Sequence, residues 1–448
     1  MRPRALLINP PSPRPVMRDY YCTSVAKAGY AWHPAEFLFQ SGVLAERFDV
    51  TIVDAIASNL TAEQTRARVG DRPIDLALGL VGATDPEADL AFLRSLGAKT
   101  LAVSGEVVRP DGVELLRRYE FVDGAMVDFS TGGLLDLIDG ADGAPGVAIW
   151  RGGEIVAPRP ETSREFRVPT PRHDLFAMAD YRMPLQKHRP FASLLTDYGC
   201  PYDCSFCNTG TLRYRRRPME DVEAELAAIR RLGVRELFLK NMSFGAHKAH
   251  SADVLDLLAR HDFTWHTYAR IEDLSAEMLA GMAAAGCHLV QIGIEHVAPE
   301  ILSAAGKRYG EDDIRRVLAD AKRVGVDVGF HLVLGLPGET RETLARLRRF
   351  LTGADGAVYI SVNLYAPRIG SRLEQAQGGG ETPHDSTSGS EHGALPRTQL
   401  EQARASMYRA FYTRPTRVAR LVSRMRPADM WGGVRGIFFG AAQTSPST

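Results

Sequence analysis

Residues 198–207 read YGCPYDCSFC and place Cys200, Cys204 and Cys207 on one short segment. Three thiolates so close together can bind three irons of a cubane iron–sulfur cluster and leave the fourth iron open for chemistry. A structural zinc ion would use paired cysteines and a fourth ligand, and the nearest histidines are not at the spacing of a zinc knuckle. The spacing therefore favours a reactive iron–sulfur centre over a structural zinc site.

Around this segment, short apolar runs alternate with helical patterns, which is typical of βα units and a parallel sheet. Six such units are too few for a closed eight-fold barrel, so we expect a partial (β/α)6 barrel over residues 191–375. The expected strands cover 192–196, 236–239, 265–269, 289–294, 326–334 and 358–364. The expected helices cover 221–232, 251–261, 275–285, 311–324 and 342–352.

A second α/β region precedes the barrel, over residues 1–150. Its expected strands each end in a breaker or a small polar group and cover 5–8, 50–53, 76–81 and 100–103. Helical patterns lie between them, so we expect a doubly wound parallel sheet. Ligands of such sheets bind beyond the carboxyl ends of the strands, and the loops that follow these strands are the candidate site.

Three further segments complete the expected organisation. Residues 151–190 are rich in Pro and Arg with weak periodicity and are predicted to be a linker. Residues 376–396 are rich in Gly, Ser and Thr and are predicted to be a disordered linker. Residues 397–448 are predicted to form a basic, helical C-terminal region, so the fold class is α/β with a helical tail.

The basic tail contains an amphipathic pattern. Val418, Leu421, Val422 and Met425 fall on one helical face, and arginines are interleaved with them. One interpretation is a helix packed on the barrel with a solvated basic face. The other is a lid, or a contact for an acidic substrate or a lipid surface.

Composition excludes several classes of protein. The chain has 448 residues, enough for two or three domains. Lys plus Arg equals Asp plus Glu at 54 each, which excludes binding of nucleic acid through bulk charge. Five cysteines exclude a disulfide scaffold. Neither a secretory signal nor a transmembrane segment is recognisable, so we expect a cytoplasmic protein.

The cysteine spacing, with the aromatic Phe206 before the third cysteine, resembles that of the radical S-adenosylmethionine (SAM) superfamily. Later segments resemble the family in order along the chain. LFLKNMSF (237–244) looks like the second-strand segment that holds the SAM amino group, although many relatives have Asp where Asn241 stands. YARIED (268–273), GIEH (293–296) and GLPGET (335–340) look like the ends of the third, fourth and fifth strands, the last near the adenine.

The resemblance implies that Cys200, Cys204 and Cys207 hold a 4Fe-4S cluster whose open iron chelates SAM. Reductive cleavage of SAM would give a 5′-deoxyadenosyl radical that takes a hydrogen atom from an unactivated carbon. A reductant such as flavodoxin or ferredoxin would supply the electron. The implied SAM-binding residues are Phe206, Asn241, Met242, Ser243, Arg270, Glu295, Gly335 and Leu336. The residues alone also allow Asn241 as a turn residue and a structural ion pair between Arg270 and Glu295.

An α/β domain directly before this barrel resembles the arrangement in the cobalamin-binding group of the superfamily. The segments LINPP (7–11) and VDA (53–55) also recur in the N-terminal domains of that group. The resemblance implies cobalamin beside Thr84, Ser104, Gly105 and Glu106. The Asp-x-His-x-x-Gly motif of a cobalt-binding histidine is absent, which forbids only that ligand. A scaffold domain without cobalamin remains the alternative.

The implied reaction is cobalamin-dependent methylation of an unactivated carbon, with radical rearrangement, cyclisation or oxidation as alternatives. His296 and His331 lie at expected strand ends and are candidate contacts for a small-molecule, lipid or peptide substrate.

Only Cys22 and Cys287 remain outside the cluster, too few for the second cysteine set of a methylthiotransferase. A non-catalytic, metal-stabilised binding protein is the distant alternative. The basic run at 213–217 has too few aromatic residues for a nucleic-acid platform. A solvated loop and helix start is expected there, with contact to a phosphate-bearing substrate as the alternative.

Overall fold

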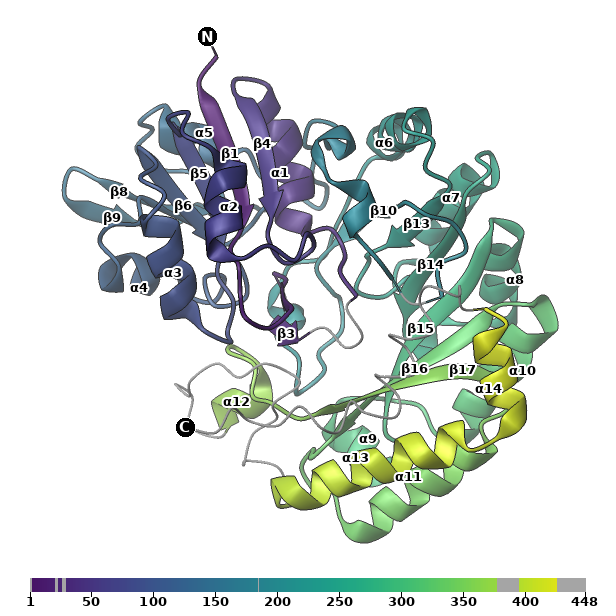
Figure 1. Ribbon diagram of the computed structural model, residues 1–448. Helices are drawn as coiled ribbons and strands as arrows, with labels where there is room; N and C mark the ends of the chain where they lie inside the picture. Colours follow the sequence, from purple (N-terminus) through teal and green to yellow (C-terminus); the bar gives the residue numbers. More distant parts are fainter. Residues whose placement is uncertain (1, 21–22, 26–29, 184, 377–394, 425–448) are drawn as a thin grey trace.

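The computed structural model describes residues 2–20, 23–25, 30–183, 185–376 and 395–424. Two sheets with helices around them lie beside each other. The first belongs to the N-terminal part of the chain and the second to the middle part (Figure 1). The fold class is therefore confirmed as α/β with two successive sheets and C-terminal helices.

The first sheet has seven strands in the order β4-β1-β5-β6-β7-β8-β9. Strands β1 and β5 are entirely buried, because their apolar runs are covered on both faces, as parallel sheets require. The strands are β1 (Arg4–Asn9), β4 (Asp49–Asp54), β5 (Leu76–Leu80), β6 (Thr100–Ser104), β7 (Gly124–Met126), β8 (Val147–Arg151) and β9 (Glu154–Val156). The helices are α1 (Ala35–Ala45), α2 (Ala62–Val69), α3 (Pro86–Arg94), α4 (Gly112–Arg118) and α5 (Gly133–Ile138).

The first five strands in this order are parallel, whereas β8 and β9 run antiparallel and were not expected. Strand β9 ends at Val156, so this sheet continues past the predicted boundary at residue 150. The division into domains stays a prediction. Because β1 lies between β4 and β5, the chain reverses its direction of winding there, and the carboxyl ends of these strands form a topological switch point.

A small hairpin, β2 (Val16–Arg18) with β3 (Thr23–Val25), lies at this carboxyl edge. Arg18 of the hairpin forms a fully buried ion pair with Asp89 of α3 and donates to the Asn9 side chain at 2.9 Å. The backbone N–H of Ala83 donates to Thr23 Oγ1 at 2.9 Å. The hairpin is thereby fixed on the edge where the sequence places the candidate site.

The second sheet has six parallel strands in chain order, β10-β13-β14-β15-β16-β17. Strands β10 and β17 are at opposite edges and do not pair, so the sheet is open, in agreement with a six-unit partial barrel. The strands are β10 (Phe191–Leu194), β13 (Glu236–Leu239), β14 (Thr264–Ala269), β15 (Cys287–Glu295), β16 (Asp327–Leu334) and β17 (Ala357–Leu364). The helices are α6 (Met219–Arg231), α7 (Lys248–Ala259), α8 (Ala276–Ala284), α9 (Pro299–Ala304), α10 (Glu311–Val324), α11 (Arg341–Gly353) and α12 (Arg372–Ala376).

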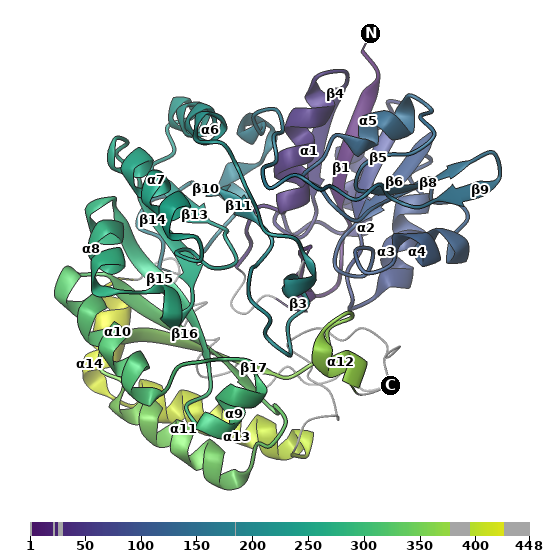
Figure 2. The same ribbon diagram turned by 180° about the vertical axis from the view of Figure 1, so that it is seen from behind.

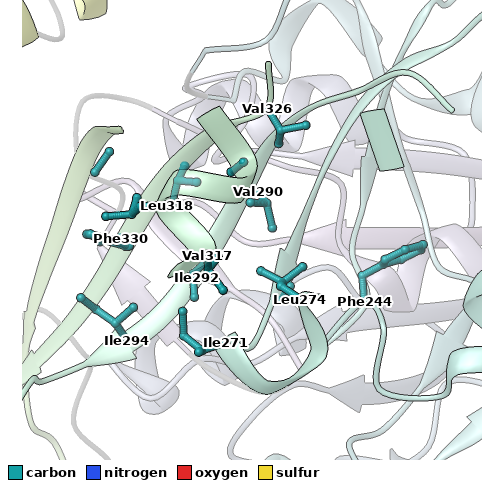
Figure 3. Packing of buried hydrophobic residues seen from close by; sticks show 14 of the residues in the cluster. Phe244, Ile271, Leu274, Val290, Ile292, Ile294, Val317, Leu318, Val326 and Phe330 are labelled. Atoms are coloured by element: carbon teal, nitrogen blue, oxygen red, sulfur yellow. The ribbon is translucent and has the colours of Figure 1, made fainter. Parts of the chain in front are cut away.

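Between this sheet and its helices lies the largest apolar core. Alternate residues of β15, such as Val290 and Ile292, point to the helical side, where Val317 and Leu318 of α10 meet them (Figure 3). All of these side chains are buried. The opposite face of the sheet faces the N-terminal half of the chain and carries polar and aromatic side chains instead. That face is where chemistry can take place.

The C-terminal helices α13 (Arg397–Tyr412) and α14 (Pro415–Val422) pack along the outside of the second sheet (Figures 1 and 2). Of the predicted apolar face, Leu421 is buried, but Val418 and Val422 are 36% and 38% exposed. Met425 lies outside the described residues. The predicted amphipathic arrangement is therefore wrong for two of the three described apolar residues.

The arginines of α14 face the protein. Arg417 is buried and donates to the carbonyl oxygens of Leu351 and Thr352 at 2.8 and 2.9 Å. Arg420 and Arg424, which follows the helix, both form ion pairs with Asp327 at the start of β16. The expected solvated basic face is thus wrong for Arg417, because helix-terminal carbonyls bind its guanidinium group. Arg420 and Arg424 remain partly exposed beside Asp327.

The predicted linker at 151–190 is folded onto the molecule. It contains two short 3₁₀ turns, His173–Leu175 and Met178–Asp180, and it buries Phe176 and Tyr181. The predicted disordered linker at 376–396 falls almost entirely outside the described residues. Among the helices that the structure describes, none combines the length and the apolarity that crossing a membrane would take.

Candidate functional site

The cysteine segment forms a loop that a short ladder closes. Strand β11 (Asp197–Tyr198) pairs antiparallel with β12 (Arg215–Arg216), so the chain between them must turn back on itself. Within the loop, the backbone N–H of Cys207 donates to the carbonyl of Cys204 at 3.1 Å. The N–H of Ser205 donates to the carbonyl of Ala305 at 3.2 Å and ties the loop to the end of α9.

The three cysteines are partly buried and free of disulfide bonds. They lie on one loop, so the structure keeps together the three thiolates that the spacing assigns to a cluster. Burial raises the pKa of Cys200 to about 12, so bound metal is needed to hold its thiolate.

Two cations favour charge on Cys204. The Arg270 guanidinium donates to Cys204 Sγ at 2.8 Å and lies 4.0 Å from the centre of the Tyr202 ring. Burial raises the pKa of Cys204, while the charges of Lys307 and Arg270 act to lower it. Lys307 was not predicted, and a single lysine after a short helix gives no sequence signal. Its position follows from α9, which returns the chain to the cysteine loop.

The ion pair between Arg270 and Glu295, the alternative to SAM contact, is not formed. Arg270 pairs with Glu272 at 2.7 Å, and Glu295 pairs with Lys307 at 3.1 Å. Glu295 closes β15 in the left-handed region, with φ of 51°, which a side chain rarely adopts and which marks a constrained position. Arg270 and Glu295 are both predicted to bind SAM. Both lie near the cysteine loop, but each forms its ion pair with a different residue.

Other predicted SAM residues gather beside the same loop. Leu336 belongs to a small apolar cluster with Ile301 and Tyr365, and Phe206 packs against that cluster. Lys307 Nζ lies 6.0 Å from the centre of the Phe206 ring. The structure thus brings Phe206 and Leu336 of the fifth-strand turn together, and the contact of both with SAM stays a prediction.

The second-strand segment follows β13. Asn241 donates from its side-chain amide to Thr196 Oγ1 at 2.7 Å and to Asp197 at 2.6 Å, so the amide is used within the protein. Ser243 Oγ donates to Asp273 at 2.6 Å and accepts from the backbone N–H of Arg270 at 3.1 Å. Met242 lies between these residues and is partly exposed. The segment thus leaves backbone groups and Met242 for a ligand, in keeping with the predicted backbone role.

At the fifth-strand turn, Gly335 has φ of 93°, a conformation that favours glycine. Its backbone N–H donates to Glu339 Oε2 at 2.7 Å. Burial raises the pKa of Glu339 to about 7 and lowers the pKa of His296 to about 4. His296 Nε2 lies 3.7 Å from Glu339 Oε1, and its Nδ1 accepts from the N–H of Ala298 at 2.9 Å. His296 is fully buried in its own loop, an arrangement that gives no support to its predicted substrate contact.

The raised pKa of Glu339 makes a prediction about stability. The unfolded chain loses this proton near pH 4.5 and the folded chain near pH 7, so stability falls as the pH rises through this window. Glu339→Gln removes the titration, and we expect the variant to gain about 2–3 kcal/mol relative to the wild type between pH 5 and pH 8. Urea unfolding of both proteins at pH 5 and at pH 8 measures this gain. If the free energies of unfolding of the variant and the wild type differ equally at both pH values, Glu339 does not have a raised pKa.

His331 lies on the polar face of the second sheet. Its Nε2 is 3.2 Å from Gln291 Oε1, which also accepts from the Tyr359 hydroxyl at 2.5 Å. The Tyr268 and Tyr359 rings both meet His331 edge-on. Of the two predicted substrate residues, His331 is the one on the face where a substrate could approach the cysteine loop, and this role remains a prediction.

The residues predicted to flank a cobalamin tail lie on two loops at the carboxyl edge of the first sheet. Thr84 Oγ1 is buried and has no hydrogen-bond partner among the described residues. Ser104 Oγ donates to the carbonyl of Met126 at 3.0 Å. The Thr84 hydroxyl is thus available to a bound molecule, whereas that of Ser104 is already used.

Gly105 and Glu106, the other two residues predicted to flank the cobalamin tail, contact other segments of the protein. Gly105 has φ of 127°, and a Cβ there would lie 2.3 Å from the carbonyl oxygen of Val81, so close packing requires glycine. Glu106 forms a buried ion pair with Arg368, which follows β17, at 2.6 Å. Glu106 therefore holds the first sheet against the second and is not free for a cofactor.

Polar atoms without partners line the junction between the two sheets. Both carboxylate oxygens of Glu36, the Tyr198 hydroxyl and the Asn208 side-chain nitrogen are buried and unpaired within the described chain. Burial raises the pKa of Glu36 to about 8. Each buried unpaired group costs about 1–3 kcal/mol, so a polar ligand at this junction would offset a penalty. The cysteine loop is adjacent, since Arg109 of the first half donates to Thr211 at 2.9 Å.

The basic run at 213–217 is not a solvated loop. Arg215 is buried and pairs with Asp128, and Arg217 is buried and pairs with Glu225. The expectation is therefore wrong for these two arginines. Both are used inside the protein and neither presents a surface to nucleic acid.

Residues 195–351 match the model of the radical SAM superfamily. The chain therefore contains a radical SAM domain. A radical SAM domain uses a 4Fe-4S cluster and SAM. The cysteine spacing favoured the cluster, and the family resemblance implied SAM. The matched range contains all eight predicted SAM residues and the three cysteines.

Three known proteins resemble this radical SAM enzyme over different lengths. An uncharacterised methyltransferase of Pyrococcus horikoshii is 23% identical over 389 residues, 83% of this chain and 82% of that protein. The tryptophan 2-C-methyltransferase of Streptomyces laurentii is 33% identical over 172 residues, 34% of this chain and 28% of that enzyme. The structure of the radical SAM methyltransferase TsrM from Kitasatospora setae, with cobalamin and a 4Fe-4S cluster bound, has a TM-score of 0.64 at 17% identity. It covers 96% of this chain and 90% of that one. The shared fold thus spans both sheets.

Proposed function

We propose that this radical SAM enzyme methylates an unactivated carbon with the help of cobalamin. The observation that carries the proposal is the junction where the cysteine loop meets the carboxyl edge of the first sheet. There, Glu36, Tyr198 and Asn208 leave buried polar atoms unpaired, as a large amide-rich cofactor would require. The shared fold with TsrM, whose structure contains cobalamin and a cluster, supports the proposal that both groups are bound.

The chain's own residues would act by holding and positioning. Cys200, Cys204 and Cys207 would hold the cluster, and Arg270 would stabilise charge on the Cys204 sulfur. When bound, the cluster supplies the electron that cleaves SAM, and cobalamin carries the methyl group. Gln291, with its partners on the polar face of the second sheet, would orient a substrate and exclude water.

Cobalamin itself would contact few side chains at the sheet edge. Thr84 offers a free hydroxyl, whereas Ser104 and Glu106 are engaged elsewhere. We therefore infer contact mainly through backbone groups of these loops, as close backbone approach at a switch point allows. A flavodoxin or ferredoxin would deliver the electron, and the substrate would be a small molecule, a lipid or a peptide.

Anaerobic purification with cobalamin supplied tests the proposal without knowledge of the substrate. About four irons and one cobalt per chain are expected, and S-adenosylhomocysteine should form only in the cobalamin-loaded enzyme. Iron with 5′-deoxyadenosine but no cobalt would overturn methyl transfer and favour a rearrangement, cyclisation or oxidation. A folded protein without iron would overturn the whole proposal.

A further inference from the structure

A second group of metal-ligating side chains lies inside the second sheet. Glu236, His266 and His288 come from the neighbouring strands β13, β14 and β15 (Figure 1). Glu236 Oε1 is 2.7 Å from His288 Nε2 and 3.4 Å from His266 Nδ1. These donor atoms all lie within 4.8 Å of one another, and all three residues are buried. None of them belongs to the cysteine site.

The strand register explains how three distant residues meet. Glu236 begins β13 opposite Thr264, and Phe238 pairs with His266 two residues further on. His288 lies near the start of β15, so the group sits toward the amino ends of the strands. Arg270, which contacts Cys204, follows His266 by four residues along the chain, or about 13 Å along an extended strand. The group is therefore separate from the cluster.

Burial makes the charge of this group costly. Glu236 is fully buried. Among the described residues, its ion-pair partners are the imidazoles of His266 and His288. A buried carboxylate needs a compensating positive charge. A cation among the three donor atoms would supply the missing charge.

The arrangement also resembles a supported metal site. The Thr264 hydroxyl donates to the second oxygen of Glu236 and so fixes the orientation of the carboxylate. The Phe238 ring stacks on His266 at 4.9 Å between centroids and holds that imidazole in place. Such outer contacts are what orient the ligands of bound metals.

We propose that Glu236, His266 and His288 bind one divalent transition-metal ion. Two imidazoles and one carboxylate form a donor set that accepts zinc, and also ferrous iron. The ion would tie β13, β14 and β15 together at the end of the sheet opposite the cysteine loop. Its role would be structural, because the surrounding residues leave it no exposure to solvent.

Metal analysis of the Cys200→Ala/Cys204→Ala/Cys207→Ala variant tests the site without interference from the cluster. After expression with zinc and ferrous iron supplied, we expect about one divalent ion per chain by mass spectrometry. Adding Glu236→Gln or His288→Asn should reduce the content at least tenfold. His261→Asn, at a partly exposed histidine, serves as the matched control and should retain the metal.

Melting temperatures give a second measurement. Excess chelator should lower the melting temperature of the triple-alanine variant and should not change that of a folded triple-alanine variant that also carries Glu236→Gln. Less than about 0.1 ion per chain in the triple-alanine variant would overturn the proposal, whether or not the ligand variants fold. Metal retained in both ligand variants would overturn it equally, and Glu236 would then be part of a hydrogen-bonded polar core.

Discussion

Replacement of Cys204 with alanine will abolish formation of 5′-deoxyadenosine from SAM. The cluster loses one of its three protein ligands, and the Arg270 guanidinium loses the sulfur to which it donates at 2.8 Å. We expect a decrease of at least about 1,000-fold, because the electron that cleaves SAM passes through the cluster. Quantification of 5′-deoxyadenosine under anaerobic, reducing conditions measures the effect, and iron analysis reports the loss of the cluster.

Cys287→Ala is the matched control. Cys287 is buried at the start of β15, and its Sγ lies 3.6 Å from the carbonyl oxygen of Leu289. Its loss removes a buried sulfur, which affects stability but no cluster ligand, so iron content and 5′-deoxyadenosine should remain within about twofold of the wild type. Full activity of Cys204→Ala with intact iron content would show that the cysteine loop does not hold the cluster.

The sequence predicted the second sheet well because its strands are long, apolar and separated by clear helical patterns. Every expected strand from 192–196 to 358–364 overlaps an observed strand, and α10 has the predicted bounds. The cysteine loop was recognisable from spacing alone. These features depend on local sequence, so one chain without relatives is sufficient to predict them.

What escaped prediction depends on tertiary contacts. Lys307 reaches the cysteine loop only because α9 turns the chain back. Arg215 and Arg417 look like surface arginines in the sequence, yet carboxylate and carbonyl partners from distant segments bury them. The short β2–β3 hairpin has only three residues in each strand, too few for a recognisable alternation of polar and apolar residues.

Lys240→Met will cost the largest amount of stability among the ion-pair variants. Lys240 Nζ lies 2.6 Å from Asp19 Oδ2, and both side chains are at most 1% exposed. Asp19 belongs to the N-terminal half, whereas Lys240 follows β13, so the pair joins the two sheets. Removal of the lysine leaves Asp19 charged and buried, and we expect a loss of about 3–5 kcal/mol in urea unfolding.

The Trp32 indole donates to Asp19 at 2.7 Å and the backbone N–H of Tyr20 donates to it at 2.9 Å. The carboxylate therefore keeps two partners, and the loss falls short of unfolding. The double variant Asp19→Asn/Lys240→Met removes both charges and should recover more than half of the loss, since no unpaired charge remains buried. Lys99→Met breaks an exposed lysine–aspartate pair and should cost less than about 1 kcal/mol. If Lys240→Met costs no more than Lys99→Met, the buried pair does not hold the sheets together. Lys240 directly precedes Asn241, which is predicted to bind SAM. Loss of the ion pair should therefore also weaken SAM binding, and equilibrium binding of SAM to the cluster-loaded Lys240→Met variant measures this effect.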